Sequence, residues 1–153
     1  MTTYQKTNAV AGSTQEVMNV RYTAKTHTSG GRRGGASRSD DGRLDVKFSA
    51  PGVPGTGTNP EQLFAAGWSA CFISAMRLVA NRMKVTLPAD VAIDAEIDLC
   101  NSADVYFLRA RFNVSLPGLE REVAQAIVNA THGATCAYSN ATRTNVEVTV
   151  SVV

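Results

Sequence analysis

Residues 59–84 read NPEQLFAAGWSACFISAMRLVANRMK, and they predict one long helix around which the rest of the chain is built. Asn59 is a favourable N-cap, Pro60 suits the first helical position, and Glu61 matches the positive end of the helix dipole. Only three polar side chains interrupt the stretch between residues 63 and 80, namely Ser69, Ser74 and Arg77. A helix that is apolar on nearly every face is expected to be buried on nearly every face.

Length and composition are typical of a folded soluble protein. The chain has 153 residues, which suits one domain with a substantial core, and residues 1–16 read as a possible N-terminal extension. Hydrophobic residues make up 44% of the chain and charged residues 18%, while the net charge of +2 is too small to indicate a nucleic-acid-binding protein. We therefore expect one domain over residues 1–153 and no nucleic acid partner.

Two observations bear on membranes and on the compartment. Residues 63–80 reach the length of a membrane span, but their many small side chains and the internal Arg77 favour a core helix. Residues 1–16 lack the apolar stretch of a signal peptide, and three cysteines without an export signal indicate a reducing compartment. The sequence thus predicts a cytoplasmic protein with no membrane segment.

Alternating apolar and polar residues predict strands on both sides of the central helix. Five such segments occur, at residues 20–25, 44–48, 91–99, 106–114 and 146–152. Asp41-Gly42 is a hairpin signal that would pair the second segment with residues 35–39. A turn at residues 100–104 would join the third and fourth segments into an antiparallel hairpin.

A second helix is predicted after the hairpin. Its apolar stripe at helical spacing consists of Leu119, Val123, Ala126, Ile127 and Ala130. His132 and Gly133 would end this helix, and residues 135–143 would form a short link before the last strand. Hairpins packed around two helices define an α+β fold with the first helix at its centre.

Cys71 lies in the middle of the predicted central helix, where a thiol has two interpretations. It can be an inert core residue, or it can be a protected nucleophile that needs a nearby cation to hold its thiolate. Cys136 is far away in the sequence, and the only histidines, His27 and His132, stand in unrelated contexts. Because closely spaced ligands are missing, no metal site is expected, and neither histidine carries the signature of a cysteine–histidine dyad.

Four segments carry a family resemblance: GTNPEQLFAAGWSACF at residues 57–72, CAYSNATRTN at 136–145, TSGGRRG at 28–34 and SDDGRLDVKFSAPG at 39–52. Together they resemble the organic hydroperoxide resistance family, within the wider OsmC-like superfamily. The resemblance runs from about Tyr22 to the C-terminus. It implies an OsmC-like fold, in which antiparallel sheets pack around a long buried central helix, and an intertwined homodimer with two active sites at the subunit interface.

The same resemblance implies an activity and assigns roles to four residues. Cys71 matches the family's peroxidatic cysteine and Cys136 its resolving cysteine, so that a disulfide between them would form in each cycle. Arg32 matches the arginine that holds the thiolate and orients the peroxide, and Glu61 matches the carboxylate that pairs with this arginine. The family reduces organic hydroperoxides, including those of fatty acids, without a bound cofactor, and lipoylated proteins reduce its disulfide.

Physical chemistry agrees with these roles. A thiolate cleaves the O–O bond, and a guanidinium group favours the thiolate without competing for its proton. Four apolar residues near Cys71 would form a pocket suited to an alkyl hydroperoxide: Phe64, Trp68, Phe72 and Met76. Plain core packing explains the same four residues equally well.

The spacing of the assigned residues sets a geometric condition. An unbroken helix would separate Glu61 from Cys71 by about 15 Å along its axis. If Arg32 is to touch both residues, the helix is expected to kink near Gly67, or Glu61 is expected to lie in a preceding turn. The chain also departs from the family pattern, with Ala137 in place of a proline and Trp68 in place of a tyrosine, and Cys100 matches no family role.

Two other functions remain as alternatives. A protein of the same fold could be a non-enzymatic redox sensor, or could bind a lipid-like ligand in the apolar pocket. A nucleic-acid binder would have to rely on a few basic residues with no aromatic side chains between them, which disfavours it. Those residues are Arg32, Arg33, Arg38 and Arg43.

Overall fold

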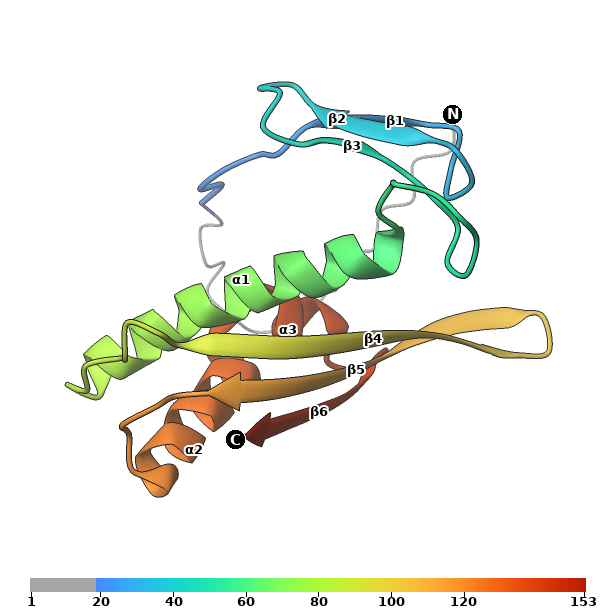
Figure 1. Ribbon diagram of the computed structural model, residues 1–153. Coiled ribbons are helices and arrows are strands. Elements are labelled where there is room, and N and C mark those ends of the chain that lie inside the picture. Colours follow the sequence, from blue (N-terminus) through green and yellow to red (C-terminus); the bar gives the residue numbers. More distant parts are fainter. Residues whose placement is uncertain (1–18) are drawn as a thin grey trace, which may run out of the picture.

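The computed structural model describes residues 19–153 (Figure 1), so the expected N-terminal extension at residues 1–16 lies outside the described part. The elements follow in the order β1 (Thr26–Ser29), β2 (Ala36–Ser39), β3 (Asp45–Lys47), α1 (Pro60–Arg82), β4 (Ala92–Ser102), β5 (Val105–Ser115), α2 (Arg121–Ala130), the π-helix η1 (Thr131–Thr135), α3 (Ala137–Thr142) and β6 (Glu147–Val152). Strands β1, β2 and β3 form one sheet, and β4, β5 and β6 form a second. The predicted α+β class is confirmed.

Helix α1 begins where the sequence predicts. The Asn59 side chain accepts a hydrogen bond of 2.8 Å from the backbone N–H of Gln62, and Pro60 takes the first helical position. The helix continues through Gly67 without a break and holds Glu61 in its first turn. The helix is therefore not interrupted at Gly67, and Glu61 does not belong to a preceding turn.

Only one side of α1 is buried within the chain. This side carries core residues, namely Trp68, Phe72, Ala75, Met76, Val79 and Ala80. The opposite side is exposed, and we call it the open face of α1; it consists of Gln62, Ala66, Ala70, Ser74, Arg77 and Leu78. The expectation of burial on nearly every face is therefore wrong for the single chain, because the second sheet covers one side only. By length and hydropathy α1 could cross a membrane, but it packs along β4 as the core helix of a soluble fold.

The second sheet lies against the buried side of α1. Strands β4 and β5 form the predicted antiparallel hairpin, in which Ile97 pairs with Ala110. The connecting turn is shorter than predicted, because β4 continues through Cys100 and leaves only residues 103–104 for the turn. Strand β6 runs parallel to β5, so this sheet is mixed and not wholly antiparallel. The parallel pairing follows from the helical connection, which returns the chain to the end of the sheet where β5 begins.

The first sheet stands apart from the second, with α1 between them in the view of Figure 1. The hairpin signal at Asp41-Gly42 is confirmed, because the chain turns there between β2 and β3 with Gly42 at a φ of 72°. The strand predicted at residues 20–25 is wrong: these residues are exposed and lie outside any strand, and β1 begins at Thr26. Alternation alone does not make a strand without a paired neighbour, and the pairing of β1 with β2 begins only at Thr26, opposite Ser39.

The connection between β5 and β6 is more helical than predicted. In α2 the side chains that reach the core are Ala124, Ile127 and Val128. Ala126 and Ala130, which belonged to the predicted stripe, are exposed. His132 and Gly133 do not end the helix, because they lie within η1, whose wider turns lead directly to Cys136.

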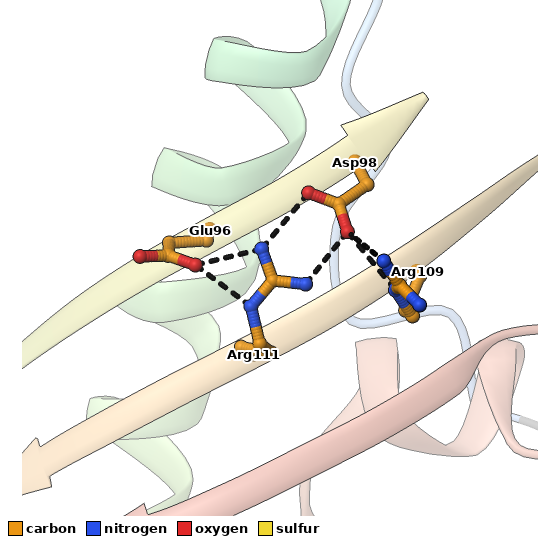
Figure 2. Close-up of polar contacts among 4 residues, drawn as sticks. All are labelled: Glu96, Asp98, Arg109 and Arg111. Atoms are coloured by element: carbon orange, nitrogen blue, oxygen red, sulfur yellow. Dashed lines mark hydrogen bonds and ion pairs between the residues drawn. The ribbon is translucent and has the colours of Figure 1, made fainter. Parts of the chain in front are cut away.

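A network of four charged side chains ties β4 to β5 on the face of the sheet that points away from the core (Figure 2). Arg111 forms contacts of 2.6 Å with Asp98 and 2.7 Å with Glu96, and Arg109 donates to Asp98 at 3.0 Å. Arg111, and then Arg109, hold the pKa of Asp98 well below its usual range. The network supports the register that turns Ala110 towards α1, because a slip by one residue would exchange the two faces of the strand.

Gly35 ends the turn that connects β1 to β2 and is the position in this turn least able to accept a side chain. A Cβ atom at Gly35 would overlap the carbonyl oxygens of Gly31 and Ser29. We predict that Gly35→Ala lowers the free energy of unfolding by about 1–3 kcal/mol, as overpacking usually does. Urea unfolding followed by circular dichroism measures the change. Gly133→Ala is the control, because a Cβ there meets nothing within 4 Å. Equal losses in the two variants would contradict the prediction.

Candidate active site

Two of the three cysteines lie side by side. Cys71 projects from the middle of α1, Cys136 follows η1, and their sulfur atoms are 3.6 Å apart. Both are free thiols; Cys136 is fully buried, whereas Cys71 is only partly buried. A disulfide requires a sulfur–sulfur distance of about 2.05 Å, so a small approach would suffice to join them once an oxidant removes the two thiol hydrogens. Cys100 lies elsewhere, on β4 opposite Phe107.

The surroundings of Cys136 keep its thiol protonated. Burial raises the pKa of Cys136, and hydrogen bonds from the backbone N–H and the hydroxyl of Ser139 oppose this rise. The nearby Cys71 raises the pKa of Cys136 further. At neutral pH Cys136 is therefore a thiol, and a thiol is a weaker nucleophile than a thiolate.

Ser139 is the centre of a buried hydrogen-bond cluster behind the cysteines. Its Oγ atom lies 3.2 Å from Trp68 Nε1, which donates to it, and 3.2 Å from His132 Nδ1. Burial, and then the charge of Arg143, lower the pKa of His132. Sequence reasoning missed this cluster, because it treated His132 as a helix end and nothing distinguishes Ser139 from the other hydroxyl residues of the chain.

Arg32 and Glu61 form a two-point ion pair at the start of α1. Arg32 Nη1 donates to Glu61 Oε2 at 3.0 Å, and Nη2 donates to Oε1 at 2.8 Å. The Arg32 guanidinium lowers the pKa of Glu61, and Glu61 raises the pKa of Arg32. The neighbouring Arg33 is exposed. Of the two adjacent arginines, the turn after β1 therefore presents Arg32 to the helix.

The arginine–glutamate pair and the cysteine pair are separate within one chain. Glu61 and Cys71 lie on the same continuous helix, at positions about 15 Å apart along its axis. Among the hydrogen bonds of the described residues, Arg32 bonds to Glu61 and none joins Arg32 to Cys71. One chain thus holds two halves of the expected site but does not bring them into contact.

A cavity of about 460 Å³ lies beside Arg32. Its lining is largely apolar, with Arg32 as its charged member, and consists of Thr28, Gly31, Arg32, Phe48, Pro60, Leu63, Phe64 and Tyr138. Of the four predicted pocket residues only Phe64 lines this cavity. Trp68, Phe72 and Met76 are completely buried and pack in the core, where Trp68 meets Phe112 edge-on at 4.9 Å between ring centroids. The pocket interpretation of these three residues is therefore corrected to core packing.

Tyr138 is a pocket residue that the sequence analysis missed. Its ring lies 6.0 Å from that of Phe64, and its hydroxyl comes within 3.1 Å of the position a Cβ would take at Gly67. Tyr138 belongs to α3, which also follows Cys136, so one short helix contributes to both halves of the site. Residues 19–153 contain no group of three His, Cys, Asp or Glu side chains placed to hold a metal ion.

The chain combines an α+β fold around a central helix with two adjacent thiols, and comparison with known proteins defines its family. The family model described as OsmC-like protein matches residues 53–151. The chain therefore belongs to the OsmC-like family. Its relatives place it with the organic hydroperoxide resistance proteins, as the sequence resemblance implied.

Two relatives and two solved structures support this assignment. The organic hydroperoxide resistance protein of Xanthomonas axonopodis pv. citri is 42% identical over 137 residues, covering 87% of this chain and 95% of its own. OhrB of Bacillus subtilis is 40% identical over 130 residues, covering 83% and 94%, and its crystal structure gives a TM-score of 0.80 over 86% of this chain and 98% of its own. A Vibrio cholerae protein, with captopril bound in one of its active sites, is 35% identical with a TM-score of 0.81 over 90% and 95%.

The Arg32–Glu61 pair is expected to make the free energy of unfolding depend on pH. The folded pKa of Glu61 is lowered from 4.5, so its contribution is present above that pH and is lost as the pH falls through the lowered value. We predict that Glu61→Gln costs up to about 1 kcal/mol of unfolding free energy at pH 7, because the pair is partly exposed, and less in acid. Urea unfolding measured at pH 7 and again in acid, below the lowered pKa of Glu61, tests this prediction. Glu122→Gln is the control, because Glu122 is exposed. A loss that is the same in acid as at pH 7 would contradict it.

Proposed function

We propose that this protein is a thiol peroxidase that reduces organic hydroperoxides to alcohols. The observation that carries the proposal is the 3.6 Å contact between Cys71, which is accessible, and Cys136, which is buried. An accessible thiol can meet a substrate, and a buried neighbour can convert the oxidised sulfur to a disulfide before further oxidation. The names of the relatives, organic hydroperoxide resistance proteins, agree with this activity.

The chemistry needs three steps. The Cys71 thiolate attacks the terminal oxygen of the hydroperoxide, the O–O bond breaks, and the alkoxide leaves with a proton as the alcohol, so that Cys71 becomes a sulfenic acid. Cys136 then attacks the sulfur of Cys71, the disulfide forms, and the hydroxyl group leaves as water. An external dithiol returns both cysteines to thiols. For this reductant we propose the lipoyl groups of lipoylated proteins, and for the compartment the cytoplasm.

Arg32 is proposed to stabilise the Cys71 thiolate and to orient the peroxide, with Glu61 holding its guanidinium in place. Within one chain no hydrogen bond among the described residues joins Arg32 to Cys71, and Glu61 lies about 15 Å from Cys71 along the axis of α1. A homodimer resolves the difficulty if the Arg32–Glu61 pair of one subunit lies beside Cys71 of the other. The open face of α1 supports such an arrangement, because its small side chains would allow a second helix to approach closely.

The cavity beside Arg32 favours an organic substrate. Its lining combines one guanidinium with Phe48, Phe64 and Tyr138, so it suits an alkyl or acyl chain that carries a polar head. Hydrogen peroxide would gain nothing from the apolar part. The Vibrio cholerae relative, with a small organic molecule in one of its active sites, is consistent with a site of this kind.

Turnover of cumene hydroperoxide with dihydrolipoamide tests the proposed function. We predict that the parent protein turns over many equivalents, and that mass spectrometry after one equivalent without reductant finds a loss of two hydrogens, mapped to the peptides of Cys71 and Cys136. Cys71→Ser is expected to abolish the reaction, because a serine hydroxyl stays protonated. Cys136→Ser is expected to consume one equivalent and then to accumulate sulfinic and sulfonic acid at Cys71 under excess peroxide.

Cys100→Ser is the matched control, because it removes a thiol that lies on β4, away from the pair. It is expected to retain the parental rate. Substantial turnover in Cys71→Ser would overturn the proposed nucleophile. A parent that forms the disulfide once but does not turn over would favour a redox sensor over an enzyme.

A further inference from the structure

The attack of Cys136 on oxidised Cys71 requires the removal of a proton from a buried thiol. Cys136 and Ser139 are both fully buried, so bulk water does not reach the thiol in this arrangement. Because burial raises the pKa of Cys136, few molecules carry the thiolate at neutral pH. A group inside the protein that takes the proton as the S–S bond forms would lower the barrier of this step.

Ser139 has the hydrogen-bond geometry of a proton carrier. The indole N–H of Trp68 can only donate, so at 3.2 Å it occupies one lone pair of Ser139 Oγ. The hydroxyl proton of Ser139 is then free to point at His132 Nδ1, 3.2 Å away, which accepts it when the ring proton is on Nε2. Cys136 precedes α3 by one residue, and its sulfur shares a hydrogen bond with the Ser139 hydroxyl. While Cys136 is a thiol, the second lone pair of Oγ is open to its S–H; once the thiolate forms, the hydroxyl donates to the sulfur and lowers the pKa of Cys136.

We propose that Ser139 and His132 form a proton relay for Cys136: the Ser139 oxygen accepts the thiol proton while its own hydroxyl proton passes to His132 Nδ1. This inference rests on the proposed function, because it concerns the second step of that cycle. Trp68 fixes the orientation of the hydroxyl, and His132 acts on Cys136 through Ser139.

The step balances in atoms and electrons. The Cys136 sulfur gives its electron pair to the Cys71 sulfur, the S–S bond forms, and the S–O bond of the sulfenic acid breaks. Cys136 is oxidised and the Cys71 sulfur is reduced, so no further oxidant is needed. The hydroxide that leaves takes up one proton to become water, and the proton held by His132 compensates for it. After the reductant has opened the disulfide, the same path can return a proton to Cys136.

The surroundings of His132 suit an acceptor. Among the described residues, Arg143 is the charged group that acts on its ring, and a guanidinium Nη of Arg143 donates to the His132 carbonyl at 3.3 Å. The ring of Phe72, from α1, lies 6.4 Å away between centroids. The thiols of Cys71 and Cys136 complete the titratable groups next to the cluster. Burial and the arginine both keep His132 neutral at pH 7, the form that can accept a proton.

His132→Gln is the most informative variant, because an amide can still bond to Ser139 but cannot take up its proton. We expect the first step, the loss of one equivalent of cumene hydroperoxide, to keep its parental rate. We expect disulfide formation to slow by a factor on the order of 100, as for the loss of a general base. Rapid mixing, quenching with an alkylating agent and mass spectrometry measure the two steps separately. Dimedone labelling follows the sulfenic acid, which should persist longer in the variant.

The pH dependence of the rate of disulfide formation distinguishes a proton relay through His132 from a purely structural role of His132. In the parent the rate of disulfide formation should fall in acid as His132 is protonated, below the ordinary histidine pKa of 6.5, because burial lowers that pKa. In His132→Gln the change of slope at the His132 pKa should vanish, and the rate should instead rise steadily with pH over the whole range as the Cys136 thiolate forms. Ser139→Ala should likewise remove the effect of His132 protonation on the rate of disulfide formation. Thr144→Ala is the matched control, because it removes an exposed hydrogen bond to Asn145 in the segment after α3 and leaves the bonds of Ser139, His132 and Arg143 in place.

The outcomes distinguish this inference from the proposed function. A parent that does not react with cumene hydroperoxide would overturn the proposed function itself. If the parent forms the disulfide and His132→Gln forms it at the same rate with the same change of slope, the relay is wrong while the peroxidase stands. A uniform slowing with the change of slope retained would also overturn the relay, because it would assign His132 a structural role only.

Discussion

The packing of α1 against the inner face of the second sheet is the contact on which the rest of the structure depends. Trp68 and Phe72 are completely buried there against Phe112 of β5, with ring centroids 4.9 Å and 6.1 Å apart. This contact fixes the rotation of the helix about its own axis, and so it decides that Cys71 faces the segment after η1. It also leaves the open face of α1 outside the core, as a side that one chain does not cover.

The parts of the fold that could be predicted are those set by local sequence. The cap at Asn59 and the hairpin turn at Asp41-Gly42 involve only neighbouring residues, and the structure reproduces both. Burial of the helix could not be predicted, because an apolar composition does not say which side a sheet will cover. The parallel direction of β6 depends on the whole helical connection before it, and alternation along one strand carries no information about direction.

In the candidate site, too, the residues with a sequence signature could be predicted, and those that depend on three-dimensional contacts could not. The family resemblance selected Cys71, Cys136, Arg32 and Glu61, and the structure brings the first two together and the last two together. It assigned no role to Ser139 or His132, because their importance comes from three-dimensional contacts between α1, η1 and α3. Trp68 and Phe72 looked equally suited to a pocket or a core, and only their packing against β5 decides for the core.

We propose that the reactive site joins the Arg32–Glu61 pair of one subunit to the cysteine pair of another. Mixed dimers of Arg32→Ala and Cys71→Ser, isolated with two different tags, test it most directly. Each variant alone should be nearly inactive with cumene hydroperoxide. A mixed dimer with shared sites holds one site with both defects and one intact site, so it should regain about half of the parental activity per dimer. Mixed dimers as inactive as the two variants would contradict the claim, because a site built within one chain would then carry a defect in every subunit.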